Sequence, residues 1–295
     1  MKIRFAVTPP STAFHESVFP DYLSACEHLG FDTLWLSDVP LGSLGDPLFS
    51  LAFAAGHTRR LKLGANVVPL GHNPWLLARQ LAQLDRMSGG RLLLSFVPGL
   101  GQPAERAVLG HPTGDRWRTV SEILALARRW WAGESVTANH GPYHFDSLAL
   151  QLRPIQQPLE VWLGGIGPAA LERVARTADG WLTAAATPAE AARGRMTICA
   201  RASELGRTID LEHFGISIPY ARSEPPAIAV EAIRQRRADR DLTQILPVGR
   251  RALVALVEAH LEGGISKFVL RSLSDSLDWR ADIDWLADIV LPLQT

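Results

Sequence analysis

Asp38 and His72 are the side chains whose type and position favour acid–base chemistry. Asp38 directly follows the apolar run TLWLS at residues 33–37, and His72 lies in the sequence GHNP. A carboxylate or an imidazole at such a position can hold a substrate or move a proton. Each also has an alternative interpretation, because an aspartate often caps a turn and a histidine in a loop is commonly only solvated. Both are candidate catalytic residues.

Motifs for nucleophilic or metal chemistry are missing from the sequence. It contains no HExxH, CxxC, GxSxG or Walker sequence. We therefore predict no metal site. Cys26 and Cys199 lie in helical patterns beside apolar residues, which favours core positions without a disulfide. A site this poor in acids, bases and nucleophiles is typical of a protein that binds an organic cofactor, which then carries the reaction.

The sequence GGIG at residues 164–167 joins an apolar run to a predicted helix. Free N–H groups at the start of a helix, together with the helix dipole, can hold a phosphate group. The same glycines could instead serve a tight turn whose backbone geometry requires them. The residues alone leave both interpretations open.

Residues 61–97 form the clearest structural unit of the sequence. The apolar run LKLGANVVPL is followed by a helix predicted at residues 74–87, with leucines at helical spacing, and then by the apolar run RLLLSFV. Strands that are apolar on both faces belong to a parallel sheet covered by helices. Asn66 and Gly99 lie at the carboxyl ends of these strands, where parallel α/β folds bind their ligands.

This alternation of strand and helix continues along the whole chain. Strands are predicted at residues 2–8, 33–37, 61–70, 91–97, 159–164, 180–184, 213–221 and 266–271, and helices at residues 16–29, 47–57, 74–87, 115–132, 168–177, 188–205, 227–240, 250–262 and 277–290. Eight alternations predict a (β/α)8 barrel that forms one domain over residues 1–295. The alternative, a doubly wound sheet, usually has a glycine-rich loop after its first strand, where this chain has Pro9 and Pro10.

Three segments exceed the minimal barrel pattern. We predict a long loop at residues 98–114 after the fourth strand, a small hairpin within residues 135–158 before the fifth, and an insert at residues 222–248 after the seventh. The insert contains the charged run RQRRADRD. Such a run is usually a solvated helix face, but its position after a strand also makes it a candidate lid.

Composition and charge narrow the class of protein. The 295 residues include 30 Lys and Arg and 30 Asp and Glu, so the formal net charge is zero. This balance does not favour a surface for nucleic acid or anionic membranes. The N-terminus MKIRFAVTPP lacks the regions of a signal peptide, and no apolar run approaches the roughly 18 residues of a membrane span. We predict a soluble cytoplasmic protein that acts on a small molecule.

Five sequence segments together resemble one enzyme family. They are FDTLWLSD, RRLKLGANVVPLGHNPWLLARQLAQLDRMSGGRLLLSF, GPYHFD, LRPIQQPLEVWLGG and ARTADGWLTA. In this order, and with the pattern LDxxSGGR, they resemble the bacterial luciferase-like flavin-dependent oxidoreductases. The resemblance is strong over about residues 1–185 and weak beyond them. Within the family, the sequence is most similar to the actinobacterial probable F420-dependent oxidoreductases.

The resemblance implies a fold and an activity. Members of this family are TIM barrels that use reduced FMN or the deazaflavin coenzyme F420. We therefore expect hydride transfer between F420 and a small organic substrate, in the direction of an F420H2-dependent reduction. The alternatives are a reduced-FMN monooxygenase and a protein that binds a flavin or deazaflavin without turnover. The family also implies a homodimer, with which the apolar helix sequence LFSLAFAA at residues 48–55 is compatible.

The resemblance further implies the cofactor site, residue by residue. The implied cofactor-binding residues are Asp38, Ala65, Asn66, Val67, Ser95, Val97, Gly99, Gly164, Gly165 and Ile166. Asp38 would contact the edge of the deazaflavin ring. The residues from Ala65 to Gly99 would line the ring and the tail, and the last three residues would hold the cofactor phosphate.

A cis peptide bond is expected between Asn66 and Val67. Asn66 interrupts an otherwise apolar strand, and a buried amide without a partner would cost about 1–3 kcal/mol. The resemblance implies a non-prolyl cis bond here, which would turn peptide groups toward the mouth of the barrel. The alternative is an ordinary bulge in which Asn66 bonds to a neighbouring strand.

Two positions depart from the family pattern. The sugar-phosphate and alcohol dehydrogenases of this family carry a histidine directly after the acid of the second strand, where this chain has Val39. They also carry a glutamate just past the fourth strand, where this chain has Leu100. The acid–base pair that oxidises an alcohol is therefore missing, which argues against that reaction.

Overall fold

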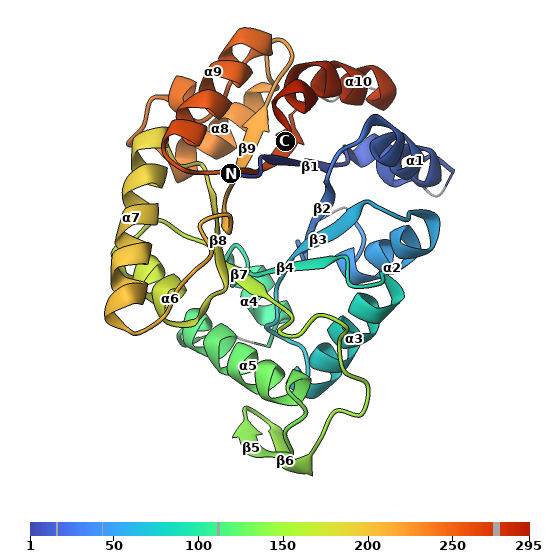
Figure 1. Cartoon of the computed structure of the whole chain (residues 1–295), viewed down its shortest axis with the longest axis vertical. Helices are drawn as coiled ribbons and strands as arrows, with labels where there is room; N and C mark the ends of the chain where they lie inside the picture. Colours follow the sequence, from blue (N-terminus) through green and yellow to red (C-terminus); the bar gives the residue numbers. More distant parts are fainter. Residues whose placement is uncertain (16, 43, 111–112, 274–277) are drawn as a thin grey trace. The chain divides into compact units, whose positions relative to one another are not determined.

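Eight parallel strands form a closed barrel in the computed structural model of this chain, which describes residues 1–15, 17–42, 44–110, 113–273 and 278–295 (Figure 1). Around the barrel their order is β1-β10-β9-β8-β7-β4-β3-β2. The strands are β1 (Arg4–Thr8), β2 (Thr33–Ser37), β3 (Lys62–Val67), β4 (Leu92–Phe96), β7 (Val161–Leu163), β8 (Gly180–Ala184), β9 (Phe214–Tyr220) and β10 (Lys267–Ser272). The predicted (β/α)8 architecture is confirmed.

Helices connect these strands, and all of them except α4 correspond to a predicted helix. They are α1 (Phe19–Leu29), α2 (Pro47–His57), α3 (Pro74–Met87), α4 (Pro103–Val108), α5 (Arg116–Trp131), α6 (Pro168–Thr177), α7 (Pro188–Glu204), α8 (Ala227–Arg236), α9 (Gly249–Glu262) and α10 (Trp279–Val290), with short 3-10 turns η1 (Ser11–Phe14), η2 (Leu242–Gln244) and η3 (Leu291–Leu293). The predicted starts of the first and last helices, Glu16 and Leu277, lie outside the described residues.

Local capping explains where several helices begin. Asp46, Asn73 and Asp115 each accept hydrogen bonds from backbone N–H groups in the first turn of the helix that follows. Thr187 does the same for α7, and Glu190 bonds back to the Thr187 N–H, which completes a capping box. Side-chain acceptors at these positions satisfy N–H groups that the helix itself leaves unbonded.

The segments beyond the minimal pattern have structure of their own. The predicted hairpin is present as the antiparallel pair β5 (Val136–His140) and β6 (Tyr143–Leu148). The segment at residues 98–114, predicted as a loop, contains the short helix α4. In the insert, α8 ends at Arg236, four residues before the predicted end at residue 240. The Gly- and Pro-rich surroundings of α4 hid it from sequence patterns.

The chain divides into two compact units, which are described separately. The first contains Met1–Trp35, Arg60–Lys62 and Trp162–Thr295, and the second contains Leu36–Arg59 and Leu63–Val161. In the first unit, Phe5 and Phe268 stack with ring centroids 5.3 Å apart, and both are buried. In the second unit, the buried side chains include Ala65 and Val67 of β3 and Leu94 and Phe96 of β4. The single domain predicted for residues 1–295 stays a prediction.

Candidate functional site

Asp38 is fixed by the backbone of β3. Its N–H donates to the carbonyl oxygen of Asn66 at 2.9 Å, and its Oδ2 accepts from the N–H of Val68 at 3.1 Å. Asp38 directly follows β2, so these bonds hold it at the carboxyl ends of two parallel strands. This is the edge at which barrels of this kind bind ligands.

The electrostatic surroundings raise the pKa of Asp38 above its ordinary value. The first cause is burial, which disfavours the charged carboxylate; Asp46 and Glu105 act in the same direction. The Val68 N–H and the side chain of His72 oppose this shift. His72 is half-buried after β3, and its electrostatic effect on the Asp38 carboxyl group couples the two predicted catalytic candidates.

The predicted cis bond between Asn66 and Val67 is wrong. Among the described residues, the cis peptide bond is Gln157–Pro158. β3 continues in regular register through this point, with Asn66 opposite Ser95. The Asn66 amide donates from Nδ2 to Ser37 Oγ at 2.9 Å. The side-chain amide of Asn66 thus has a partner on the neighbouring strand, and its backbone carbonyl accepts from the Asp38 N–H. A cis bond is not needed to provide these hydrogen bonds.

The residues of β3 and β4 separate onto two faces. Asn66 and Ser95 are register partners, so their side chains project from the same face. Ala65 and Val67 alternate with Asn66 and are fully buried on the opposite face. Ser95 is also buried, and its Oγ has no hydrogen-bond partner in the part of the chain that the structure describes. The face with Asn66 is therefore the one that carries an unpartnered hydroxyl, that of Ser95.

The loop after β4 is held in place by two charged side chains. Val97 N–H donates to the Val67 carbonyl at 2.9 Å, and Gly99 has a left-handed backbone with φ of +73°. Glu105 of α4 is buried and accepts from the Gly101 N–H at 2.9 Å. A Cβ on Gly99 would lie 2.4 Å from Glu105 Oε1, so this position requires glycine.

Arg116 completes this support, because it donates from Nη1 to the carbonyl oxygens of Pro98 at 2.7 Å and Gly99 at 3.1 Å. The sequence analysis missed Glu105 and Arg116. The signal that could have found them is the pair of glycines at 99 and 101 in the predicted loop, followed by an acid in that loop and by a base in the first turn of the next predicted helix.

The turn at residues 164–167 belongs to the other compact unit. Gly165 has φ of +100°, and a Cβ there would lie 2.7 Å from the Ala170 Cβ. Its carbonyl oxygen accepts from Trp181 Nε1 at 2.9 Å. A Cβ on Gly164 would lie 2.6 Å from the Leu182 carbonyl oxygen. The tight-turn interpretation therefore holds. The phosphate interpretation for Gly164, Gly165 and Ile166 stays a prediction.

Metal-ligand clusters and membrane-spanning helices are both absent from the described residues. No group of three or more His, Cys, Asp or Glu side chains in that part of the chain could hold a metal ion. Within the same residues, no helix is both long and apolar enough to cross a membrane.

Comparisons with known proteins identify relatives. Over 192 residues the chain is 30% identical to an F420-dependent glucose-6-phosphate dehydrogenase of Nakamurella multipartita. The matched segment covers 61% of this chain and 56% of the relative. Over 180 residues it is 31% identical to a limonene 1,2-monooxygenase of Rhodococcus erythropolis. That match covers 59% of this chain and 46% of the relative. The chain thus spans about half the length of the curated relatives that it matches.

A solved structure of an F420-dependent secondary alcohol dehydrogenase, in complex with an F420-acetone adduct, superposes with a TM-score of 0.81 over all of both chains. The identity is 18%, so this likeness concerns the fold. The family profile described as luciferase-like monooxygenase matches residues 4–288. The resemblance inferred from sequence motifs is thereby confirmed, and the chain belongs to the luciferase-like monooxygenase family.

Proposed function

We propose that this chain is an oxidoreductase that transfers a hydride between coenzyme F420 and a small organic substrate, in the direction of an F420H2-dependent reduction. The observation that carries the proposal is the chemistry of the strand ends. The described ends of β2, β3 and β4 offer one acid, Asp38, with the Asn66 amide and the Ser95 hydroxyl, and they offer no nucleophile activated by a base. Such a site depends on a cofactor for its reactivity. The similarity to F420-dependent relatives supports this choice.

The residues present fit a flat heterocyclic cofactor. The Ser95 hydroxyl is buried without a partner, and Asn66 projects from the same face of the sheet. An unpartnered buried hydroxyl is costly, and a ring with polar atoms at its edge offers hydrogen bonds near it. When bound, the deazaflavin supplies the hydride.

The protein groups would orient the reactants and exclude water. Asp38 is held by the Val68 N–H, and its raised pKa makes it our candidate for holding a proton at the ring edge. The turn at Gly164, Gly165 and Ile166 would bind the cofactor phosphate, because no side chain caps the start of α6. Val39 and Leu100 stand where alcohol dehydrogenases of the family have their acid–base pair, so we propose reduction of a C=C or C=N bond.

Parallel binding titrations test the cofactor assignment. Purified protein is titrated with F420 and with FMN, with tryptophan fluorescence as the readout. We expect saturable binding of F420 that is tighter than that of FMN. The Asn66→Leu variant should bind F420 about tenfold more weakly, because it loses one polar group of the site. The matched control Asn139→Leu changes an amide in the β5–β6 hairpin and should bind as the wild type does.

The second candidate is a reduced-FMN monooxygenase, which the 31% identity to a limonene 1,2-monooxygenase supports. Tighter binding of FMN than of F420, with substrate-dependent oxygen consumption, would select it. F420 binding without oxidation of F420H2 by any activated alkene or imine would select the non-catalytic alternative. Binding of neither cofactor would refute all three.

A further inference from the structure

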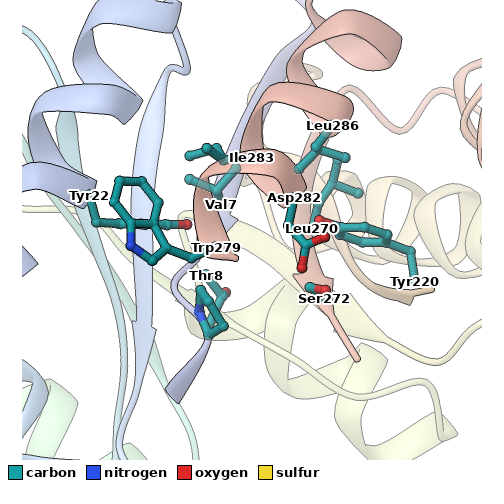
Figure 2. Close-up of a pocket in the computed structure, with 11 residues that line it drawn as sticks. Val7, Thr8, Tyr22, Tyr220, Leu270, Ser272, Trp279, Asp282, Ile283 and Leu286 are labelled. Atoms are coloured by element: carbon teal, nitrogen blue, oxygen red, sulfur yellow. The ribbon is translucent and has the colours of Figure 1, made fainter. Parts of the chain in front are cut away.

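A small cavity lies between the strands and the last helix of the first compact unit. Its walls come from the carboxyl ends of β1, β9 and β10 and from α1 and α10, and its polar and aromatic lining includes Thr8, Tyr22, Tyr220, Ser272, Trp279 and Asp282 (Figure 2). The space available to the centre of a water-sized atom is about 10 Å³, which is room for a single one. The cavity is therefore too small for an organic ligand.

Asp282 brings an unpaired carboxylate oxygen to this cavity. Its side chain is only 6% exposed. Oδ1 accepts from Arg222 Nη1 at 2.7 Å, whereas Oδ2 is buried and has no hydrogen-bond partner in the described parts of the chain. A buried acceptor without a donor is costly, and a charged acceptor forms stronger hydrogen bonds than a neutral one. An occupant of the cavity that can donate to Oδ2 would remove this cost.

Hydroxyl groups supply the other polar atoms of the lining. Thr8, Tyr220 and Ser272 are the last residues of β1, β9 and β10, which are consecutive strands of the barrel. Tyr220 and Ser272 are register partners, and Figure 2 shows the Asp282 carboxylate beside them. Burial raises the pKa of Tyr220, and the charge of Asp282 acts in the same direction, so the phenol keeps its proton. Each of these hydroxyl groups can both donate and accept.

The charge balance around Asp282 favours a neutral occupant. The guanidinium of Arg222 lies 2.7 Å from the carboxylate, so the pair carries no net charge. A metal cation at Oδ2 would lie close to that guanidinium and would be repelled by it. A water molecule at the same place would donate to Oδ2 and form its remaining hydrogen bonds with the hydroxyl groups of the lining.

The same carboxylate holds the start of the insert at residues 222–248. Arg222 is the first residue of the insert, and its guanidinium also lies over the ring of Trp285 in α10, 5.6 Å from the ring centroid. Ala221, the residue before it, pairs with Val248 across the base of the insert. The orientation of the carboxylate therefore sets the direction in which the insert leaves β9.

We propose that this cavity is a hydration site, in which one buried water donates to Asp282 Oδ2, bonds to the surrounding hydroxyl groups and so fixes the carboxylate that holds Arg222. Asp282 is then a positioning residue for the insert, and the water is part of its support. The proposal depends neither on a cofactor nor on the proposed function.

A crystal structure of the wild-type chain at high resolution tests the occupant. We expect one density peak about 2.5–3.0 Å from Asp282 Oδ2, the distance of an O–H···O hydrogen bond. The peak should be the same in crystals grown in sodium and in potassium salts. A cavity without a peak, a protein group that donates to Oδ2 in its place, or a peak that grows when potassium replaces sodium would each overturn the hydration site.

Limited proteolysis tests the positioning role. Tyr220→Phe removes one hydroxyl group from the cavity and leaves Arg222 and its carboxylate partner unchanged. We expect cleavage within residues 222–248 to be about fivefold faster, since the loss of one hydrogen bond favours local opening. Tyr143→Phe makes the same change in the β5–β6 hairpin and should be cleaved at the wild-type rate.

Asp282→Asn removes the charge that Arg222 contacts and should speed the same cleavage further. Asp284→Asn is the matched control, because it makes the same change at an exposed position of α10. Circular dichroism confirms that each variant is folded. Faster cleavage in Asp282→Asn but not in Tyr220→Phe would show that the ion pair acts without the water, and this result would overturn the proposal. Wild-type rates in both variants would overturn it as well.

Discussion

The N–H of Val68 donates to the Oδ2 of Asp38 across 3.1 Å, so the end of β3 orients the acid that follows β2. The two residues are 30 positions apart in the chain. The orientation of Asp38 is therefore a property of the paired strands and not of its own turn. This relationship gives the first prediction, because the bond and the charge of Asp38 can be removed separately.

Asp38→Asn should raise the melting temperature at neutral pH. Burial raises the pKa of Asp38 in the folded protein. The folded state therefore loses stability relative to the unfolded chain as pH rises from the ordinary aspartate pKa through the raised one. An asparagine Oδ1 can still accept from the Val68 N–H and carries no charge. The difference between variant and wild type should disappear below the ordinary aspartate pKa of about 4. Thermal unfolding followed by circular dichroism across this pH range measures it.

Asp38→Ala is the control for this effect. It leaves the Val68 N–H without its acceptor, which should cost about 1–3 kcal/mol at every pH. A wild type that is more stable than Asp38→Asn at neutral pH would contradict the prediction, because the charge would then be stabilising.

Gly165→Ala should destabilise the fold and weaken F420 binding. The backbone at Gly165 has φ of +100°, and the new Cβ would lie 2.7 Å from that of Ala170. Strain of this kind costs on the order of 1–3 kcal/mol. Gly167→Ala is the matched control, since Gly167 has φ of −74° and a Cβ there meets nothing within 4 Å. Equal denaturation midpoints and equal F420 affinities for the two variants would show that the turn does not require Gly165.

Glu190→Gln should lower stability at neutral pH and loosen the insert at residues 222–248, because Glu190 pairs with Arg237 and Arg240 of that insert. Burial alone would raise the pKa of Glu190, but the Thr187 N–H and the guanidinium groups of Arg240 and Arg237 outweigh it and lower the pKa to about 2. A depressed pKa contributes stability above the ordinary glutamate value, and this contribution is lost as pH falls toward 2. The difference in melting temperature should therefore shrink in acid.

Limited proteolysis gives a second readout for the same variant. Cleavage within residues 222–248 should be faster in Glu190→Gln than in the wild type at neutral pH. Glu231→Gln, which removes an exposed carboxylate from α8 itself, is the control and should be cleaved at the wild-type rate. Equal rates for Glu190→Gln and the wild type would contradict the expectation that Glu190 holds residues 222–248 in place through Arg237 and Arg240.

Phe49→Asp should convert a dimer into monomers. The homodimer is a prediction, which the apolar surface of α2 and α3 supports: Phe49 is 79% exposed and Met87 56% exposed. Both line a surface cavity of about 440 Å³ that also contains Gln80 and Gln83, so a protruding ring and a partly apolar hollow lie on one face. A patch of this kind is typical of a self-complementary contact.

Sedimentation at micromolar concentration measures the effect. Ile228→Asp, which changes an 83% exposed residue of α8, is the control and should stay dimeric. A monomeric wild type, or a dimer that persists in Phe49→Asp, would contradict this interface.

The sequence by itself determined the barrel and most helix boundaries, because both depend on local patterns. The buried strands are continuous apolar runs, and Asp46, Asn73 and Thr187 cap helices through residues two or three positions away. The predicted strand ends also placed Asp38 and Asn66 at the carboxyl ends of β2 and β3. Motifs that lie within about 185 residues were sufficient for the family.

Only the tertiary structure decided how the polar groups are paired. Asn66 bonds to Ser37, 29 positions away, and this partner makes the predicted cis bond unnecessary. Glu105 supports Gly101 through a helix that sequence patterns did not indicate. Register between strands and the path of an insert fix such distances, and both arise from contacts between residues that are distant in the sequence.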